Sequence, residues 1–499
     1  MDLLYALKRA SIRVITCRHE LSAAFAADGY ARASGKPGIV LVDGGPGCLN
    51  TLTALKTSYK DGIPVVMLIG TEISRRMNNE AEFQTVSFPN NIVRHVYTVR
   101  GDNIYKVIRE SIHLSTKNPN TLVVIQIPLD ISRSKCLQQV AYTPFKSTFA
   151  LTKPEDKFSN VIRIMIESIN ESKKPLVIIG GGVLQSRSEE IIERFIHKYN
   201  IPAVCTSAAR GVIREDDLLF LGTPGIIGSA NANKILNESD LLLAFGTRLS
   251  NRFLHKIDTK GKKIFQINLE ESHIRSDLNV IPVKFDVKSV LATLLESGVL
   301  EVKKPWKIRD NDKRFPVERR WGITPALLSI FKEIEDPIIF CDDGTYTVKV
   351  LQLYKALRPR TLLFSANMAA GGHALPGAIG AKFTDKTRKV IVITGDGGML
   401  TNIGELQVYS ENNLEILIVV FNNGGYDSIN QWSQKYKVPL NFNFGHIDFT
   451  AIANGFGIRA YTIDDLETLE ETVRDYQWDG PLLLNLIVPP ERVDCHFPD

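Results

Sequence analysis

The residues best suited to chemistry lie in two glycine-rich segments in the last third of the chain. Asp396 stands in GDGG, directly after the apolar run KVIVITG, and Asn423 stands in NNGGY, directly after the apolar run EILIVVF. Each run has the length and composition of a buried strand, and a helix is expected between them. Because neighbouring parallel strands end at the same edge of a sheet, we expect Asp396 and Asn423 to face each other across one crevice.

This edge would offer only oxygen ligands. A carboxylate, an amide oxygen and a nearby backbone carbonyl suit a hard divalent cation such as Mg²⁺. Gly395, Gly397 and Gly398 would let the backbone approach a phosphate group closely. Asp-Gly and Asn-Gly are also common turn dipeptides, so either segment alone could simply end a strand. Their combination at this spacing favours a site for a metal ion and a diphosphate.

The elements that must position these residues alternate along the whole chain. Apolar runs of strand length follow helical segments, which predicts an α/β protein with three successive open domains on mainly parallel sheets. We predict these domains at residues 1–145, 155–300 and 320–499, separated by a polar segment and a charged segment. The predicted strands are GIVLVDG, PVVMLIG and TLVVIQIP, then PLVIIGGG, PAVCTS, LLLAFG and KIFQINL, then PIIFCD, KVIVITG, EILIVVF and PLLLNLIV.

Composition excludes several classes of protein. The 499 residues are 44% hydrophobic and 23% charged with a net charge of +5, which argues against collagen, coiled coil and wholesale disorder. The sequence contains no long run of Lys or Arg, so it does not favour nucleic-acid binding. The apolar stretches are too short for a membrane span, and the first residues do not resemble a signal peptide, so we expect a cytoplasmic protein. Six scattered cysteines without a CxxC pair indicate neither a disulfide framework nor a zinc site.

GDGG followed by NNGGY resembles the signature of thiamin diphosphate enzymes, and CRHELSAAFAADGYARASGKPGIVLVDGGPG resembles the first-domain signature of their acetolactate synthase branch. The resemblance extends over nearly the whole chain. It implies thiamin diphosphate as cofactor and Mg²⁺ held by Asp396, Asn423 and the carbonyl of Gly425. It further implies pyrimidine-binding, middle and diphosphate-binding domains, and a homodimer or homotetramer with active sites at the subunit interface. A regulatory subunit is a further possible partner.

The resemblance identifies Glu20 as the carboxylate that contacts the pyrimidine ring of the cofactor. The residue types give this role physical sense. A carboxyl group at the turn between the strand-like VITCRH and an alanine-rich helix, in a pocket poor in water, would keep its proton because of desolvation. It could then share a hydrogen bond with a ring nitrogen and promote deprotonation of the thiazolium. A glutamate that merely begins a helix is the competing interpretation.

Other residues match the cofactor and substrate pocket of the family. The resemblance places Gly45 and Pro46 of the GGPG loop beside the thiazolium, and Gly344, Thr345 and Tyr346 at the diphosphate. It assigns a catalytic role to Gln84, the position under the cofactor to Gly371, and substrate contacts to Phe83, Arg252 and Trp432, with Arg252 binding the carboxylate of a second oxo acid. Simple turns, an exposed loop pair and a buried core tryptophan remain the structural alternatives.

The middle domain contains VIIGGGVLQS. Gln185 stands where a dinucleotide-binding fingerprint requires glycine, which argues against a classical Rossmann cofactor site. The resemblance nevertheless leaves FAD possible, with contacts from Gly181, Gly182, Arg248 and Asp286. Glycines after a strand and a surface arginine need no ligand, so a purely structural interpretation stays open.

Three features depart from the family pattern. A helix and a strand normally precede the Arg-His-Glu segment in the family. The first sheet is therefore expected to lack a strand, and the sequence to be truncated at its start or the protein to be degenerate. Gly371 replaces a bulky aliphatic residue, so Met368 or another neighbour bends the cofactor or the cofactor is held less firmly. Ile226 and Ile227 replace the methionine and histidine of the flavin side, and Asn251 replaces the aspartate before Arg252. Flavin binding and substrate choice therefore stay open.

Together these observations predict an enzyme that decarboxylates a 2-oxo acid, pyruvate first, and joins the product to a second 2-oxo acid. The product would be acetolactate or a related acetohydroxy acid of branched-chain amino acid biosynthesis. A first alternative is a decarboxylase, or a carboligase with an aldehyde or sugar ketone as acceptor. A second alternative is a non-catalytic relative that binds partners or regulates another subunit.

Overall fold

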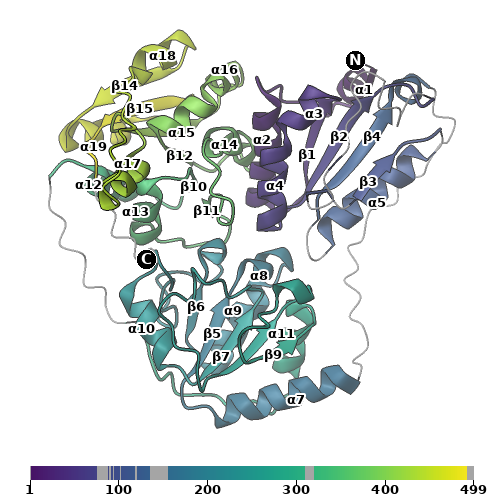
Figure 1. Cartoon of the computed structure of the whole chain (residues 1–499), viewed down its shortest axis with the longest axis vertical. Helices are drawn as coiled ribbons and strands as arrows, with labels where there is room; N and C mark the ends of the chain where they lie inside the picture. Colours follow the sequence, from purple (N-terminus) through teal and green to yellow (C-terminus); the bar gives the residue numbers. More distant parts are fainter. Residues whose placement is uncertain are drawn as a thin grey trace. The chain divides into compact units, whose positions relative to one another are not determined.

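The structure is a computed structural model that describes residues 2–75, 88, 92–93, 95–101, 103–117, 121–134, 156–309 and 320–491. Its described strands form three sheets with parallel ladders (Figure 1). The predicted α/β class with three parallel-sheet domains is confirmed. Contacts divide the chain into unit 1 (Met1–Thr148, Pro337–Gly344 and Leu363–Pro490) and unit 2 (Phe149–Asp336, Thr345–Leu362 and Glu491–Asp499). The predicted domain boundaries stay predictions.

The first sheet of unit 1 has the strand order β1-β2-β4-β3. Its strands are β1 (Gly38–Asp43), β2 (Val65–Thr71), β3 (His95–Thr98) and β4 (Val123–Pro128), and the helices of this part are α1 (Asp2–Arg9), α2 (Glu20–Ser34), α3 (Pro46–Asn50), α4 (Leu52–Asp61), α5 (Ile104–Thr116) and α6 (Leu129–Ser132). β2 and β4 are mostly apolar and buried, as strands covered on both faces require. The sequence predicts these two strands and β1, but not the half-exposed β3.

The strand-like segment VITCRH (residues 14–19) and the two residues before it do not form a strand. Ile12 and Val14 are exposed, and within the described part of the chain no strand pairs with this segment. An apolar pattern gives a strand only where a neighbouring strand satisfies its backbone groups. The expectation of a strand-to-helix turn before Glu20 is therefore wrong.

The second sheet of unit 1 has the order β11-β10-β12-β13-β15-β14. Its strands are β10 (Ile338–Cys341), β11 (Leu362–Leu363), β12 (Val390–Gly395), β13 (Ile416–Asn422), β14 (Arg459–Ile463) and β15 (Leu482–Ile487), and its helices are α14 (Ala374–Lys382), α15 (Asp396–Thr401), α16 (Leu406–Glu411), α17 (Asp427–Lys435), α18 (Phe449–Gly455) and α19 (Leu466–Asp475), with a 3-10 turn η3 (Ile403–Glu405). Every residue of β12 and β13 is buried, as their apolar sequences predict.

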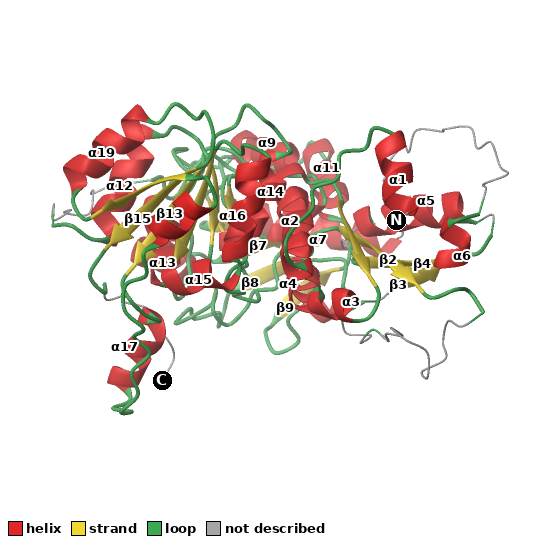
Figure 2. Ribbon diagram, turned by 90° about the horizontal axis from the view of Figure 1, so that it is seen from above, coloured by secondary structure: helices red, strands yellow, loops and turns green. Residues whose placement is uncertain are grey.

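Helices α2 and α14 bring the two sheets of unit 1 together, and both views show them side by side (Figures 1 and 2). A Cβ atom on Gly29 would lie 2.0 Å from the carbonyl oxygen of Gly377, and one on Gly380 would lie 1.8 Å from the carbonyl oxygen of Ala26. Only glycine permits backbones to approach this closely. Because α2 begins at Glu20 and α14 follows Gly371, this packing brings two predicted site segments near each other.

Unit 2 contains the third sheet, with the order β6-β5-β7-β8-β9. Its strands are β5 (Pro175–Ile179), β6 (Ala203–Cys205), β7 (Leu241–Phe245), β8 (Lys263–Ile267) and β9 (Val280–Val283), and its helical segments are α7 (Asp156–Glu171), α8 (Gly181–Gln185), α9 (Glu189–Tyr199), η1 (Ser207–Ala209), α10 (Ala230–Glu238), η2 (Glu271–His273), α11 (Val287–Glu296), α12 (Ile323–Glu333) and α13 (Thr345–Leu353). All residues of β5 and β7 are buried.

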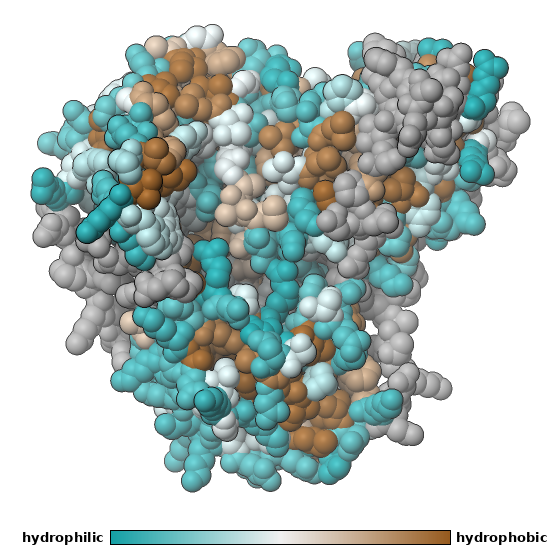
Figure 3. Space-filling view, in the orientation of Figure 1, coloured by the Kyte–Doolittle hydropathy of each residue, from teal (hydrophilic) through white to brown (hydrophobic). Residues whose placement is uncertain are grey.

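The surface alternates between apolar and polar patches (Figure 3). In unit 1, large apolar side chains are exposed on α17 and in the residues on either side of it: Tyr426, Ile429, Tyr436, Val438, Leu440 and Phe444. None of the helices that the structure describes is long and apolar enough to cross a membrane.

Candidate active site

The carboxyl ends of β12 and β13 place Asp396 beside the NNGGY segment. Gly395 is paired with Phe421 in the parallel ladder, so the residues that follow lie at one edge of the sheet. The Asp396 carboxylate is buried and accepts hydrogen bonds from the N–H groups of Gly397 (2.7 Å), Gly424 (2.8 Å) and Gly425 (3.1 Å). Burial raises the pKa of Asp396, although these N–H groups oppose that effect. We call Asp396–Gly398 with Asn423–Gly425 the glycine edge.

The two asparagines of NNGGY have different roles. The Asn422 side chain is fully buried and donates to the carbonyl of Ile447 (2.8 Å) and to Oδ1 of Asn485 (3.0 Å). The Asn423 side chain is partly exposed and makes no hydrogen bond to any described residue. Asn422 therefore holds the loop in place, whereas the amide oxygen of Asn423 is available to a ligand.

Gly397 and Gly398 keep the backbone of the glycine edge uncovered by side chains of their own. A Cβ atom on Gly397 would lie 2.4 Å from the ring of Tyr426, and one on Gly398 would lie 2.5 Å from Oδ2 of Asp342. At both positions a Cβ atom would displace a neighbouring side chain, so the packing favours glycine there. The chemistry of the donors, a carboxylate, an amide oxygen and the Gly425 carbonyl, fits Mg²⁺.

Glu20 is the first residue of α2 and lies next to the GGPG loop. Oε2 of Glu20 accepts a hydrogen bond from Nδ2 of Asn50 (3.1 Å), and a Cβ atom on Gly47 would lie 3.4 Å from Oε1. Gly45 caps the short helix α3 with a positive φ of 61°, and Pro46 begins that helix. The structure thus brings the predicted loop and the predicted carboxylate together.

The expectation that Glu20 keeps its proton because of desolvation is wrong. The hydrogen bond from Asn50 lowers the pKa of Glu20, and burial opposes this only weakly because the side chain is half-exposed. Sequence reasoning assumed a pocket poor in water. Asn50 lies on a different helix, α3, and nothing in the sequence indicates that its amide would reach the carboxylate.

Hydrogen bonds tie the start of α2 to the segments around the glycine edge. Oε1 of Glu405 accepts from the N–H groups of Arg18 (2.9 Å) and His19 (3.2 Å), the two residues before Glu20. The Asn402 side chain connects the first turn of α2 with the backbone of Gly372. Sequence reasoning missed Glu405 and Asn402, although both are polar residues shortly after GDGG in a largely apolar region.

Gly371 is exposed, and a Cβ atom added there would meet no atom within 4 Å. Gly372 is buried with a φ of 77°, and a Cβ atom there would lie 2.5 Å from Cβ of Thr401. The position that carries a bulky residue in the family pattern therefore adjoins open space. Met368 is 37% exposed, and no contact shows that it fills this space.

Three family models match the chain. They are the thiamine pyrophosphate enzyme N-terminal TPP binding domain over residues 1–91, the central domain over 162–294 and the C-terminal TPP binding domain over 342–486. The chloroplastic acetolactate synthase of Arabidopsis thaliana is 31% identical over 99% of this chain and 78% of that protein. The acetolactate synthase large subunit of Cyanidium caldarium is 29% identical over 96% and 87%. The chain belongs to the thiamin diphosphate enzyme family, in its acetolactate synthase branch.

A solved structure shares the fold. The chain is similar to a Rhodococcus jostii thiamine diphosphate-dependent 4-hydroxybenzoylformate decarboxylase, with a TM-score of 0.78 and 18% identity over 96% of this chain and 92% of that one. The family models support thiamin diphosphate as the cofactor of this enzyme.

In this thiamin diphosphate enzyme, the structure describes two of the three residues that are predicted to contact substrate. Arg252 is an exposed residue of unit 2, and its carbonyl oxygen accepts from the N–H of Ile226 (2.9 Å). Trp432 is half-exposed on α17 and stacks on Tyr436 with ring centroids 5.4 Å apart, so its interpretation as a core tryptophan is wrong. Their substrate roles stay predictions. Phe83 and Gln84 lie outside the described residues.

The roles predicted for Gly344, Thr345 and Tyr346 at the diphosphate also stay predictions. Gly344 is the last residue of its segment of unit 1, whereas Thr345 and Tyr346 are buried residues that begin α13 in unit 2.

The residues considered for FAD have structural explanations. A Cβ atom on Gly182 would lie 2.7 Å from Cα of Gly246, so glycine is needed where these loops cross. Oδ2 of Asp286 caps α11 by accepting from the N–H of Ser289 (3.2 Å). Gly181 begins α8, and Arg248 is half-buried near β7. Neither the geometry of these residues nor the family comparison supports FAD.

Proposed function

We propose that this enzyme decarboxylates a 2-oxo acid, pyruvate first, and transfers the two-carbon product to a second 2-oxo acid, giving acetolactate or a related acetohydroxy acid. The observation that carries the proposal is the glycine edge, where a buried carboxylate, a partly exposed amide oxygen and glycine backbone lie together at the ends of two paired strands. The relatedness to acetolactate synthases supports the choice of reaction.

The residues of the glycine edge would hold the metal and the diphosphate. Asp396, the free amide oxygen of Asn423 and the carbonyl of Gly425 would bind Mg²⁺, which neutralises the carboxylate whose charge the fold disfavours. The backbone at Gly397 and Gly398 would lie against the diphosphate. When bound, thiamin diphosphate supplies the nucleophilic carbon and the electron sink that decarboxylation of a 2-oxo acid requires.

Glu20 would hold and exchange a proton with the aminopyrimidine ring. Its low pKa belongs to a half-exposed carboxylate with an amide donor. A ring placed against it would exclude water and favour the protonated carboxyl, which raises the pKa toward the value that proton exchange near neutral pH needs. Arg252 would bind the carboxylate of the acceptor with its planar guanidinium.

A decarboxylase is the second candidate. Ile226, Ile227 and Asn251 depart from the family pattern around Arg252, and an acceptor site altered in this way would leave a proton as the simplest acceptor. We also propose that the enzyme works as a homodimer or homotetramer with active sites at the subunit interface, which light scattering on the purified protein would test.

The test of the proposed function is turnover of pyruvate by wild type and Glu20→Gln with thiamin diphosphate and Mg²⁺. Wild type should release CO₂ and form acetolactate, and the variant should bind the cofactor but turn over about 100-fold or more slowly. CO₂ with acetaldehyde would support the decarboxylase instead. A folded wild type that neither binds nor reacts would overturn both candidates and favour a non-catalytic protein.

A further inference from the structure

A buried arginine of unit 2 holds the C-terminal end of α13. Arg210 follows η1, between β6 and β7 of the third sheet, whereas α13 follows β10 of the second sheet; both Arg210 and α13 belong to unit 2. The Arg210 guanidinium donates to the carbonyl oxygens of Leu351 (2.7 Å) and Tyr354 (2.5 Å). The last carbonyl groups of a helix lack partners within the helix, and a cation is favourable at this negative end of the helix dipole. Arg210 therefore caps α13 from a distant part of the chain.

Glu215 holds both Arg210 and the segment after α13. Its carboxylate accepts from Nε and Nη2 of Arg210, and also from the N–H of Ala356 (3.2 Å). The N–H of Glu215 donates to the carbonyl of Ala356 (3.2 Å). Both charged side chains are buried, and a bidentate arginine–carboxylate pair has a specific geometry. The Arg210–Glu215 pair therefore fixes the guanidinium against the end of α13.

The residues that follow α13 are closely packed. Gly211 has a φ of 78°, and a Cβ atom there would lie 2.0 Å from the carbonyl oxygen of Arg358. Only glycine permits this approach of the two backbones. Tyr354 also packs against Phe331 of α12, with ring centroids 5.3 Å apart. The end of α13 thus cannot shift unless the loop that carries Arg210 shifts with it.

The other end of α13 carries predicted cofactor contacts. The helix begins with Thr345 and Tyr346, both buried, and Thr345 directly follows Gly344. These three residues are predicted to contact the diphosphate. At 1.5 Å per residue, the nine residues of α13 span roughly 14 Å, and they move together as one rod. A change at the last turn is therefore transmitted to the first.

We propose that Arg210 and Glu215 are positioning residues, which fix the orientation of α13 and thereby set the affinity of the enzyme for the diphosphate of its cofactor. The proposal deepens the proposed function and rests on it for the identity of the ligand. Loss of the pair should loosen α13 and weaken diphosphate binding. It should leave the reaction of the bound cofactor largely unchanged, since neither residue is predicted to contact the reacting atoms.

The test compares Arg210→Gln with the double variant Arg210→Gln, Glu215→Gln. The double variant removes both buried charges, so its effect does not arise from a carboxylate left without its cation. Arg275→Gln is the matched control, because Arg275 also pairs with an acid, Asp277, and donates to a backbone carbonyl, that of Leu249 (2.5 Å). None of the described hydrogen bonds of the Arg275 side chain goes to α13.

Hydrogen exchange of the protein without cofactor is measured first. Peptides covering residues 345–353 should exchange faster in both Arg210 variants than in wild type, and should be unchanged in Arg275→Gln. Peptides covering β12 and β13 should be unchanged in all three variants. Exchange at residues 345–353 that stays as in wild type in the double variant would overturn the proposal.

The second measurement is titration with thiamin diphosphate and Mg²⁺ at a temperature at which every variant is folded. The Kd should rise about tenfold in both Arg210 variants and less than about twofold in Arg275→Gln. Inorganic diphosphate with Mg²⁺ should lose affinity by the same factor. The rate at saturating cofactor should stay within about twofold of wild type. An unchanged Kd in the double variant, or an equal rise in Arg275→Gln, would show a merely structural role and overturn the proposal.

These measurements separate two failures. A wild type that binds no thiamin diphosphate would overturn the proposed function and the role of the pair in affinity, whereas hydrogen exchange would still decide whether the pair fixes α13. A wild type that binds and reacts, with variants of equal Kd, would overturn only the role of the pair. If Arg210→Gln does not fold, the double variant decides, since it leaves no buried charge without a partner.

Discussion

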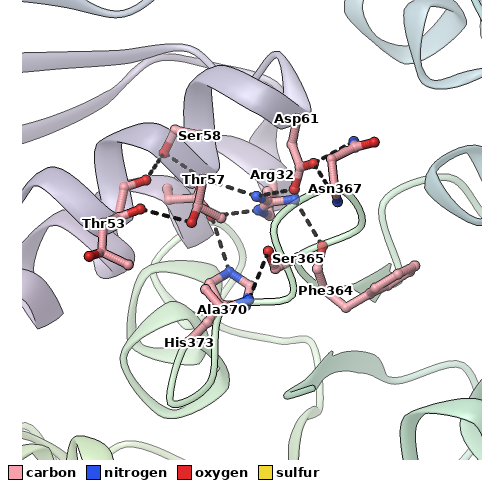
Figure 4. A network of polar contacts seen from close by, with 12 residues as sticks. Arg32, Thr53, Thr57, Ser58, Asp61, Phe364, Ser365, Asn367, Ala370 and His373 are labelled. Carbon is pink, nitrogen blue, oxygen red and sulfur yellow. Dashed lines mark hydrogen bonds and ion pairs between the residues drawn. The ribbon is translucent and has the colours of Figure 1, made fainter. Parts of the chain in front are cut away.

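The Asp28–Arg32–Asp61 cluster and the glycine edge are both buried polar regions of unit 1, but they differ in the source of positive charge. In the cluster, Arg32 donates to Asp28 (2.5 Å), to Asp61 (2.8 Å) and to the carbonyl of Phe364 (3.0 Å) (Figure 4). The imidazole of His373 lies 3.3 Å from Asp28. The cluster joins α2 and α4 to the segment that leads to Gly371.

At the glycine edge, the described donors to Asp396 are all uncharged backbone N–H groups. The pKa values of the two aspartates differ accordingly. Burial alone would raise both, but Arg32 and His373 lower the pKa of Asp28 to about 2, whereas the pKa of Asp396 stays raised. The difference teaches that the fold supplies a cation where two helices are joined and leaves the Asp396 carboxylate without one at the proposed metal site.

The largest expected effect is the loss of protein stability when the Asp28–Arg32–Asp61 cluster is broken. Arg32→Met keeps much of the side chain but leaves Asp28 and Asp61 buried without their cation, which should cost about 3–5 kcal/mol of unfolding free energy. Urea unfolding at pH 7 measures it. Arg163→Met, which breaks the exposed pair with Glu167, should cost only about 0.5 kcal/mol. A cost below about 1 kcal/mol for Arg32→Met would contradict the role assigned to the cluster.

Removing the carboxylate of the glycine edge should affect binding instead. Asp396→Asn keeps the shape of the side chain but removes the charge that attracts Mg²⁺, so metal-dependent binding of thiamin diphosphate should weaken by about 100-fold or more. Calorimetric titration with and without Mg²⁺ measures it, with Asp385→Asn on the exposed turn after α14 as control. Binding within about threefold of wild type would place the metal elsewhere.

The two aspartates should also give opposite pH dependences of stability. Asp28 has a lowered pKa of about 2, so it contributes stability above the unfolded-state pKa of about 3.9 that is lost as the pH falls toward 2. Asp396 has a raised pKa, so its contribution is fully present below about 3.9 and is lost as the pH rises through the folded-state pKa.

Metal-free unfolding measurements between pH 3 and 7 on Asp28→Asn and Asp396→Asn check this contrast. The stability advantage of wild type over Asp28→Asn, of about 2 kcal/mol at most, should shrink toward low pH. The unfolding free energy of Asp396→Asn should increase relative to that of wild type as the pH rises. If the unfolding free energies of the two variants varied with pH in the same way, the two aspartates would not have the opposite pKa shifts that the structure indicates.

Strands covered on both faces could be predicted from the sequence, whereas edge strands and remote contacts could not. β12 and β13 are continuous apolar runs, and the glycines after them indicate the site edge. β14 reads RAYTI with exposed positions, because an edge strand needs little apolar surface. VITCRH has the composition of a strand, but none of the described strands pairs with it, and composition alone does not show whether a pairing strand exists.

The site shows the same limit. The proximity of Asp396 and Asn423 could be predicted because each residue follows a strand of the same sheet. Asn402 and Ser22 are separated by 380 residues, and only the packing of α2 on α14 brings them together. Nothing in the sequence pairs Asn50 with Glu20, which is why the direction of the Glu20 pKa shift could not be foreseen.

The smallest expected effect concerns the adjacent glycines at the turn. A side chain on Gly371 would enter open space, and its backbone conformation is one that other residues adopt, whereas Gly372 has a φ of 77° and no room. Gly371→Leu should therefore fold normally and tighten thiamin diphosphate binding by about fivefold, since about 1 kcal/mol of apolar contact is gained. Gly372→Leu should instead lose about 1–3 kcal/mol of stability. Weaker binding in Gly371→Leu would mean that the cofactor or substrate already occupies this space, and the open position would then be a feature of the pocket.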